Sequence, residues 1–129
     1  MTTQHTTRIE IVDGHWQLNG AVTYPGAPAE GLLMNVRMVN ATFEDTAPAA
    51  GARLAQFDPQ ANTAAFIAQI PDYVTYGMRA FTLNLQGGMP GYEGARNSAF
   101  APDGTLDPQY MGRVRRTIDA CDRAGAAVI

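Results

Sequence analysis

Alternating apolar and polar residues predict a β-strand over residues 78–88, in the middle of the chain. One face of this strand is apolar and the other is small or polar: Phe81, Leu83 and Leu85 against Ala80, Thr82, Asn84 and Gln86. Residues 32–39 have the same pattern, with one face that becomes polar at Asn35 and Arg37. Helical patterns lie before and after the central strand, so we predict strands alternating with helices around a parallel sheet.

Two segments with apolar residues at helical spacing predict helices over 62–77 and 107–125. Each starts at a residue able to cap its first turn and ends at a glycine: Asn62 and Gly77, then Asp107 and Gly125. Pro71 is expected to kink the first helix or restart it. In the second helix Cys121 lies on the apolar stripe and is expected in the core, whereas several arginines are expected to point mostly outward: Arg113, Arg116 and Arg123.

Residues 8–23 are predicted to form a small antiparallel β-element. Two alternating segments flank Asp13-Gly14, a strong signal for a two-residue hairpin turn: Ile9–Val12 and His15–Leu18. Because an isolated hairpin is marginally stable, it is expected to pack on the rest of the chain with Trp16 as its anchor. Sugar stacking is the alternative role for this indole.

The polarity of the central strand favours a closed barrel over an open sheet. Strands of an open parallel sheet are covered by helices on both faces and are apolar throughout, whereas a barrel strand turns its second face inward. The sequence stops at Gly125-Ala-Ala-Val-Ile129, which resembles a helix cap followed by the start of a buried strand. We therefore predict an α/β fold that is the N-terminal portion of a (β/α)8 (TIM) barrel, incomplete over 8–129, with the hairpin at 8–23 and roughly the first two βα units at 32–129. A natural short edge strand is the alternative.

Composition excludes several classes of protein. The 129 residues are 46% apolar and 16% charged, with a net charge of −3, which is typical of a globular domain and argues against a nucleic-acid partner. The first seven residues are expected to be a disordered tail and do not form a secretory signal. No apolar run is long enough to span a membrane, so we expect a cytoplasmic protein without a membrane partner.

One cysteine excludes an intrachain disulfide. Neither histidine has a partner at metal-ligand spacing, and the glycines at 87–91 fit no phosphate or dinucleotide motif, so no metal or cofactor is predicted.

The candidate site lies at the carboxyl ends of the predicted strands. Links from strand to helix run to about twenty residues, whereas links from helix to strand are one or two, and ligands bind on the long-loop side of α/β folds. We predict that four polar residues form a binding surface for a polyhydroxylated substrate: Asn35, Arg37, Asn84 and Gln86. The alternative is a buried polar network that satisfies itself without a ligand.

The long loops also carry acidic and aromatic residues: Glu44, Asp45, Tyr92, Glu93, Phe100 and Asp103. Glycoside hydrolysis requires two carboxylates at a defined separation, which spacing in the sequence does not establish here. Loop carboxylates are usually solvated or stabilise turns, so none is assigned a catalytic role. Tyr92 and Phe100 are candidates for a sugar platform or for packing that fixes the loop.

Several stretches resemble the N-terminal part of bacterial cellulase-like glycoside hydrolases: Asn19-Gly20 with Tyr24-Pro-Gly26, Glu30-Gly-Leu-Leu-Met-Asn-Val-Arg-Met-Val39, Phe57-Asp-Pro59, Asn62-Thr63 with Phe66-Ile67, Ala80-Phe-Thr-Leu-Asn-Leu-Gln-Gly-Gly88 and Asn97-Ser-Ala-Phe100. The resemblance implies a (β/α)8 barrel that hydrolyses O-glycosidic bonds with two glutamates at the ends of its fourth and seventh strands. Both would lie outside this sequence, so the chain alone is expected to be inactive and to need the rest of its own barrel as partner.

The resemblance implies at most a supporting role for Arg37, Asn84 and Gln86 beside the sugar. Two alternatives remain: a non-catalytic carbohydrate-binding or structural protein of the same fold, and a self-contained small α/β binding domain. The barrel fragment and the self-contained domain differ in their expected unfolding. The unfinished sheet of a fragment would associate or melt without cooperativity, whereas a complete domain would unfold cooperatively as a monomer.

Overall fold

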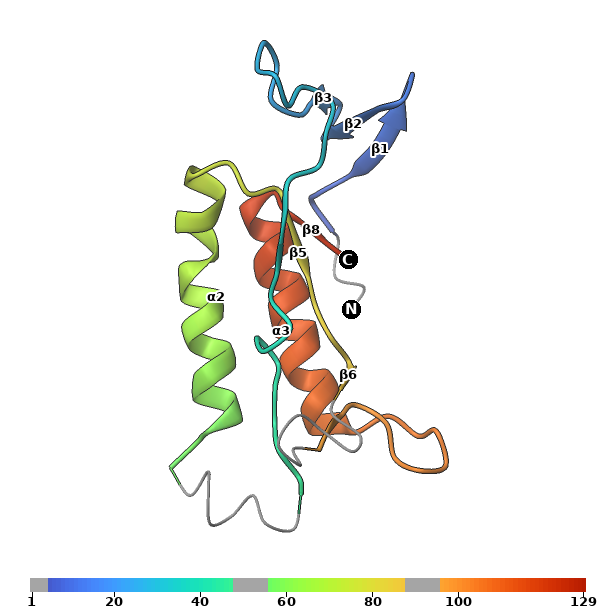
Figure 1. The fold of residues 1–129 in the computed structure, drawn as a ribbon, viewed down its shortest axis with the longest axis vertical. Coiled ribbons are helices and arrows are strands. Elements are labelled where there is room, and N and C mark those ends of the chain that lie inside the picture. The colour runs from blue at the N-terminus through green and yellow to red at the C-terminus, as the bar shows by residue number, and fades with distance from the viewer. Residues whose placement is uncertain (1–4, 48–55, 88–95) are drawn as a thin grey trace.

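The computed structural model describes residues 5–47, 56–87 and 96–129. Within them the strands form an antiparallel sheet, a parallel sheet and a two-stranded ribbon: β1 (Ile9–Val12), β2 (His15–Leu18) and β3 (Ala21–Val22); β4 (Asn35–Arg37), β5 (Ala80–Thr82) and β8 (Ala127–Val128); β6 (Gln86–Gly87) and β7 (Asn97–Ser98). The helices are α2 (Pro59–Thr75) and α3 (Pro108–Ala124), which lie side by side (Figure 1).

The predicted hairpin is confirmed. β1 pairs with β2 so that Ile11 faces Trp16, and Asp13 and Gly14 both have a positive φ, 50° and 79°, as a tight two-residue hairpin turn requires. The antiparallel sheet lies at the end of the molecule where α2 and α3 finish, and the described parts of the two long loops lie at the opposite end (Figure 1). Trp16 is half-buried, and its backbone N–H donates to the carbonyl of Gly31 at 2.9 Å.

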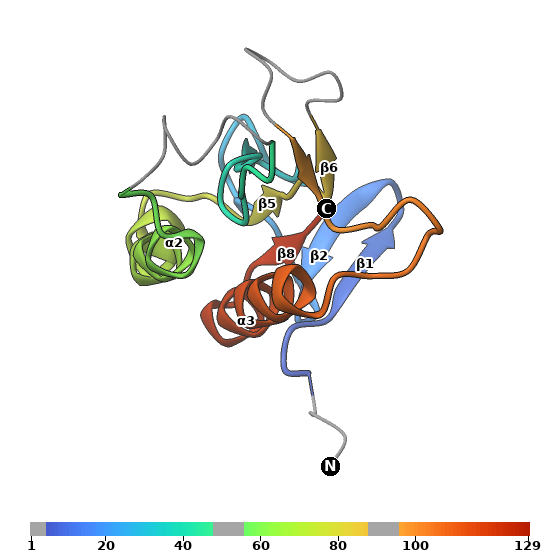
Figure 2. The ribbon, with the colours of Figure 1, turned by 90° about the horizontal axis from the view of Figure 1, so that it is seen from below.

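The parallel sheet has the order β4-β5-β8, and its apolar face is covered by both helices. Register places Val36, Phe81 and Val128 side by side on this face. Phe81 is fully buried and packs with Ile70 of α2 and Cys121 of α3, so the predicted core role of that cysteine is confirmed. Viewed from below, the sheet lies against the two helices as a second layer (Figure 2).

The prediction that the chain is the N-terminal portion of a (β/α)8 (TIM) barrel is wrong for this structure. β4, β5 and β8 form an open three-stranded sheet, and among the described residues no strand joins its two outer edges. The helices cover only one face, while Asn35 and Arg37 are exposed on the other. An open sheet covered on one side produces the same apolar and polar alternation as a barrel strand, and this ambiguity explains the error.

Several element boundaries also differ from the prediction. α2 begins at Pro59 because the carboxylate of Asp58, and not Asn62, caps it, accepting from the N–H of Gln60 at 2.8 Å. Pro71 lies inside α2 without ending it. The central strand divides, since β5 ends at Thr82 and the next strand, β6, begins at Gln86. α3 has the predicted caps: Asp107 at its start, and after its last residue Gly125 with φ 72°.

Part of the segment predicted as a tail lies against α3. The N–H groups of Thr6 and Thr7 donate to the carboxylate of Asp122 at 2.7–3.0 Å, and the hydroxyl of Thr7 donates to the Asp122 carbonyl at 2.6 Å. The helices of the described ranges are too short or too polar to cross a membrane.

Candidate functional site

The two long loops that follow β4 and β5 meet at the carboxyl end of the parallel sheet. The N–H of Thr46 donates to the carbonyl of Arg96 at 2.8 Å, and the N–H of Arg96 donates to Asp45 Oδ1 at 2.8 Å. One residue earlier in the first loop, the N–H of Glu44 donates to Oδ1 of the buried Asn97 at 3.1 Å. Segments about fifty residues apart in sequence are therefore held together as one surface.

A cavity of about 720 Å³ lies between these loops and the start of α3. We call it the loop cavity; its lining is Glu44, Thr46, Gln86, Arg96, Ser98, Phe100, Ala101, Pro102, Thr105, Leu106, Asp107 and Pro108. The lining combines hydrogen-bonding side chains with Phe100, which is 38% exposed. This volume lies within the range of small-molecule sites.

Arg113 lies directly behind the loop cavity and is 1% exposed. Its guanidinium forms an ion pair with the Glu44 carboxylate, donates through Nε to the Thr42 carbonyl at 3.4 Å, and stacks on the Tyr110 ring with 4.9 Å to the centroid. The prediction that this arginine points outward is wrong. The helical pattern of α3 contains no partner for a buried cation, because Glu44 is 69 residues away in sequence.

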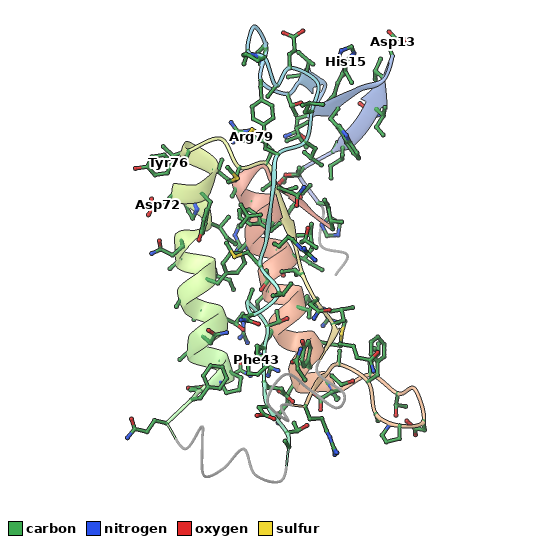
Figure 3. The ribbon with its side chains drawn as sticks, in the orientation of Figure 1. Asp13, His15, Phe43, Asp72, Tyr76 and Arg79 are labelled. Atoms are coloured by element: carbon green, nitrogen blue, oxygen red, sulfur yellow. The ribbon has the colours of Figure 1, made fainter. Side chains whose placement is uncertain are left out.

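The same cluster ties the first loop to the central strand. The Tyr110 hydroxyl, which is buried, donates to the Asn84 carbonyl at 3.0 Å, and the Thr42 hydroxyl donates to the Tyr110 oxygen at 3.5 Å. In Figure 3, Phe43 marks this end of the molecule beside the start of α2, and Tyr76 marks the far end of the same helix. The cavity wall is therefore fixed by contacts among Thr42, α3 and the segment between β5 and β6.

The four residues predicted to bind substrate lie in different places. Gln86 lines the loop cavity. Asn35 and Arg37 lie on the outer face of β4, where Asn35 Oδ1 accepts from the Thr82 hydroxyl at 3.2 Å. Arg37 also lines a smaller cavity, about 420 Å³, beside α2. Asn84 is half-buried, and its carbonyl belongs to the Tyr110 cluster.

The loop carboxylates that the structure describes are engaged in structural contacts. Glu44 pairs with Arg113, and Asp107 accepts from the N–H of Tyr110 at 2.7 Å as the cap of α3. Asp103 stabilises a turn, and hydrogen bonds from the hydroxyl and the N–H of Thr105 lower the pKa of its carboxyl. The sequence patterns gave Asp107 only a capping role, although it also lines the cavity. Tyr92 and Glu93 lie outside the described residues.

Within the described ranges, no cluster of three or more histidine, cysteine or acidic residues is arranged to hold a metal ion. Burial raises the pKa of the Cys121 thiol to about 11, which suppresses its nucleophilic thiolate form.

Searches of known protein families, curated proteins and solved structures found no match to this chain. The resemblance to cellulase-like hydrolases therefore stays a prediction from the sequence.

Proposed function

We propose that this chain binds a carbohydrate in the loop cavity. The observation that supports the proposal is the lining itself, where an exposed aromatic ring lies among side chains that donate and accept hydrogen bonds. A sugar presents both kinds of surface, with hydroxyl groups at its edge and C–H groups on its ring faces.

The polar lining suits hydroxyl groups better than a purely apolar ligand. The Gln86 amide offers both donors and an acceptor, and Arg96 offers a fork of donors. Phe100 supplies an apolar face on which a sugar ring can bury its C–H groups. Gln86 connects the proposal to the sequence prediction, which assigned it to a polyhydroxylated substrate.

Binding without hydrolysis is expected for these 129 residues. Glu44 and Asp107 line the cavity but are occupied by the ion pair with Arg113 and by the cap of α3. Because both carboxylates are engaged in structural contacts, we expect no turnover of p-nitrophenyl glycosides.

The test is an NMR titration of the 15N-labelled chain with the methyl glycosides of glucose, galactose, mannose and xylose, and with cellobiose. We expect saturable shifts around Gln86, Ser98 and Phe100. Phe100→Ala should weaken binding about tenfold or more, because it removes the apolar contact. Tyr76→Ala is the matched control, since Tyr76 is 84% exposed and lies at the far end of α2 (Figure 3). Absence of saturable shifts, or equal effects of the two variants, would contradict the proposal.

A further inference from the structure

The ion pair between Arg113 and Glu44 connects the protein interior with the loop cavity. The Arg113 side chain is 1% exposed, whereas the Glu44 side chain is 18% exposed and belongs to the cavity lining. A buried cation is costly to desolvate and is normally kept only where its charge is compensated. Here the compensating carboxylate belongs to a residue that lines the cavity.

Contacts on both partners fix the position of this carboxylate. The Arg113 guanidinium lies between the Thr42 carbonyl, at 3.4 Å from Nε, and the Tyr110 ring. The Glu44 backbone is held by Asn97 at 3.1 Å. The Arg113 guanidinium donates to Oε2 of Glu44. Within the described residues, Oε2 is the oxygen through which the Glu44 carboxylate accepts hydrogen bonds. Among the same residues no hydrogen bond involves the second oxygen, Oε1, which can accept from a ligand.

We propose that Glu44 is the acceptor that orients a carbohydrate in the loop cavity by binding one specific hydroxyl group, and that Arg113 is the positioning residue that holds this carboxylate. The inference rests on the proposed function and adds a specificity determinant to it. An ionised carboxylate accepts hydrogen bonds only, whereas the Gln86 amide both donates and accepts. Among the described residues, two carboxylates line the cavity; Asp107 caps α3, whereas Glu44 is held by a side-chain ion pair, so Glu44 is the one that we expect to require a donor at one position of the sugar.

The experiment pairs ligand variants with protein variants. The methyl glycoside that binds best is compared with its monodeoxy derivatives, using the wild-type chain, Glu44→Gln and Glu10→Gln. The Glu44→Gln variant keeps the shape of the side chain and an oxygen for Arg113, but it presents an amide donor to the cavity. Glu10→Gln is the matched control, because Glu10 also pairs with an arginine, Arg8 at 2.5 Å, in the antiparallel sheet.

We expect wild type and Glu10→Gln to lose about tenfold or more in affinity for one monodeoxy derivative, as removal of a hydrogen bond to a charged group implies. In Glu44→Gln, that derivative and its parent should bind within about twofold of each other. Equal weakening of all derivatives by Glu44→Gln would overturn the inference and leave carbohydrate binding intact. No saturable binding of any glycoside to the wild-type chain would overturn both.

The role of Arg113 is tested with Arg113→Met, which keeps an unbranched side chain without the charge. A positioning role predicts that this variant loses the same hydroxyl discrimination and that adding it to Glu44→Gln changes affinity no further. Thermal melts and NMR spectra of every variant separate loss of fold from loss of binding. A folded Arg113→Met that still discriminates the same hydroxyl would refute the positioning role.

Discussion

Removing the Glu44 carboxylate should destabilise the fold more than removing the Arg113 guanidinium with which it pairs. In Glu44→Ala the guanidinium stays 1% exposed with its charge uncompensated. Breaking a buried pair in this way costs about 3–5 kcal/mol, and we expect about 3 kcal/mol because the Thr42 carbonyl and the Tyr110 ring remain. In Arg113→Met the Glu44 carboxylate is left 18% exposed to the cavity, where water can solvate it, so we expect a loss of only about 1–2 kcal/mol.

The assay is urea unfolding followed by circular dichroism near neutral pH, with m-values checked for two-state behaviour. The double variant Glu44→Ala/Arg113→Met should be more stable than Glu44→Ala alone, because it removes the uncompensated charge together with its partner. The control is the pair between Arg8, 76% exposed, and Glu10, where single substitutions should cost less than about 1 kcal/mol. If Arg113→Met is as destabilising as Glu44→Ala, unequal burial does not determine the energetics of the pair.

Three further predictions concern the core, the cysteine and the segment bound to α3. Phe81→Ala should cost about 3–5 kcal/mol in urea unfolding, because the ring is fully buried and contacts Phe66 and Tyr73 at 5.5 and 5.7 Å between centroids; a loss below about 1 kcal/mol would contradict this packing. Cys121, with its pKa raised to about 11, should resist a disulfide reagent at about pH 8 and react fully once the chain is denatured; rapid labelling of the native protein would refute its burial. Hydrogen bonds from the N–H groups of Thr6 and Thr7 lower the pKa of Asp122 below 3.8, so its stabilising contribution is complete above that pH and is lost as the pH falls through the lower folded value. Asp122→Asn should therefore have a lower melting temperature than wild type at neutral pH, and the gap should close in acid; a gap that is constant with pH would contradict the linkage.

Local signals in the sequence predicted the local elements well. Asp13-Gly14 requires a positive φ at two consecutive residues, and α3 begins and ends at residues with specific capping chemistry. These features depend on neighbouring residues alone. The alternation around Phe81 also identified correctly which strand face meets the helices.

Features that depend on distant contacts were predicted poorly. One-sided polarity fits both a barrel strand and an open sheet covered by helices on one face, so the alternation could not distinguish them. Arg113 was expected at the surface because its partner lies in a loop far along the chain. The loop cavity also depends on pairing between Thr46 and Arg96, for which neither loop has a local pattern. Gln86 was the only one of the four proposed binding residues that lines this cavity.

The contact of Thr6 and Thr7 with Asp122 has a consequence for the order of folding. It joins residues 116 and 115 positions apart, so it closes nearly the whole described chain into a loop. Closing a flexible loop of that length costs roughly 4 kcal/mol of chain entropy, which surface hydrogen bonds alone do not offset. The contact therefore forms after the helices and the parallel sheet have brought the two segments together, and it is the first to open when the fold loosens. Amide hydrogen exchange at Thr6 and Thr7 would then report partial opening before the core around Phe81 exchanges.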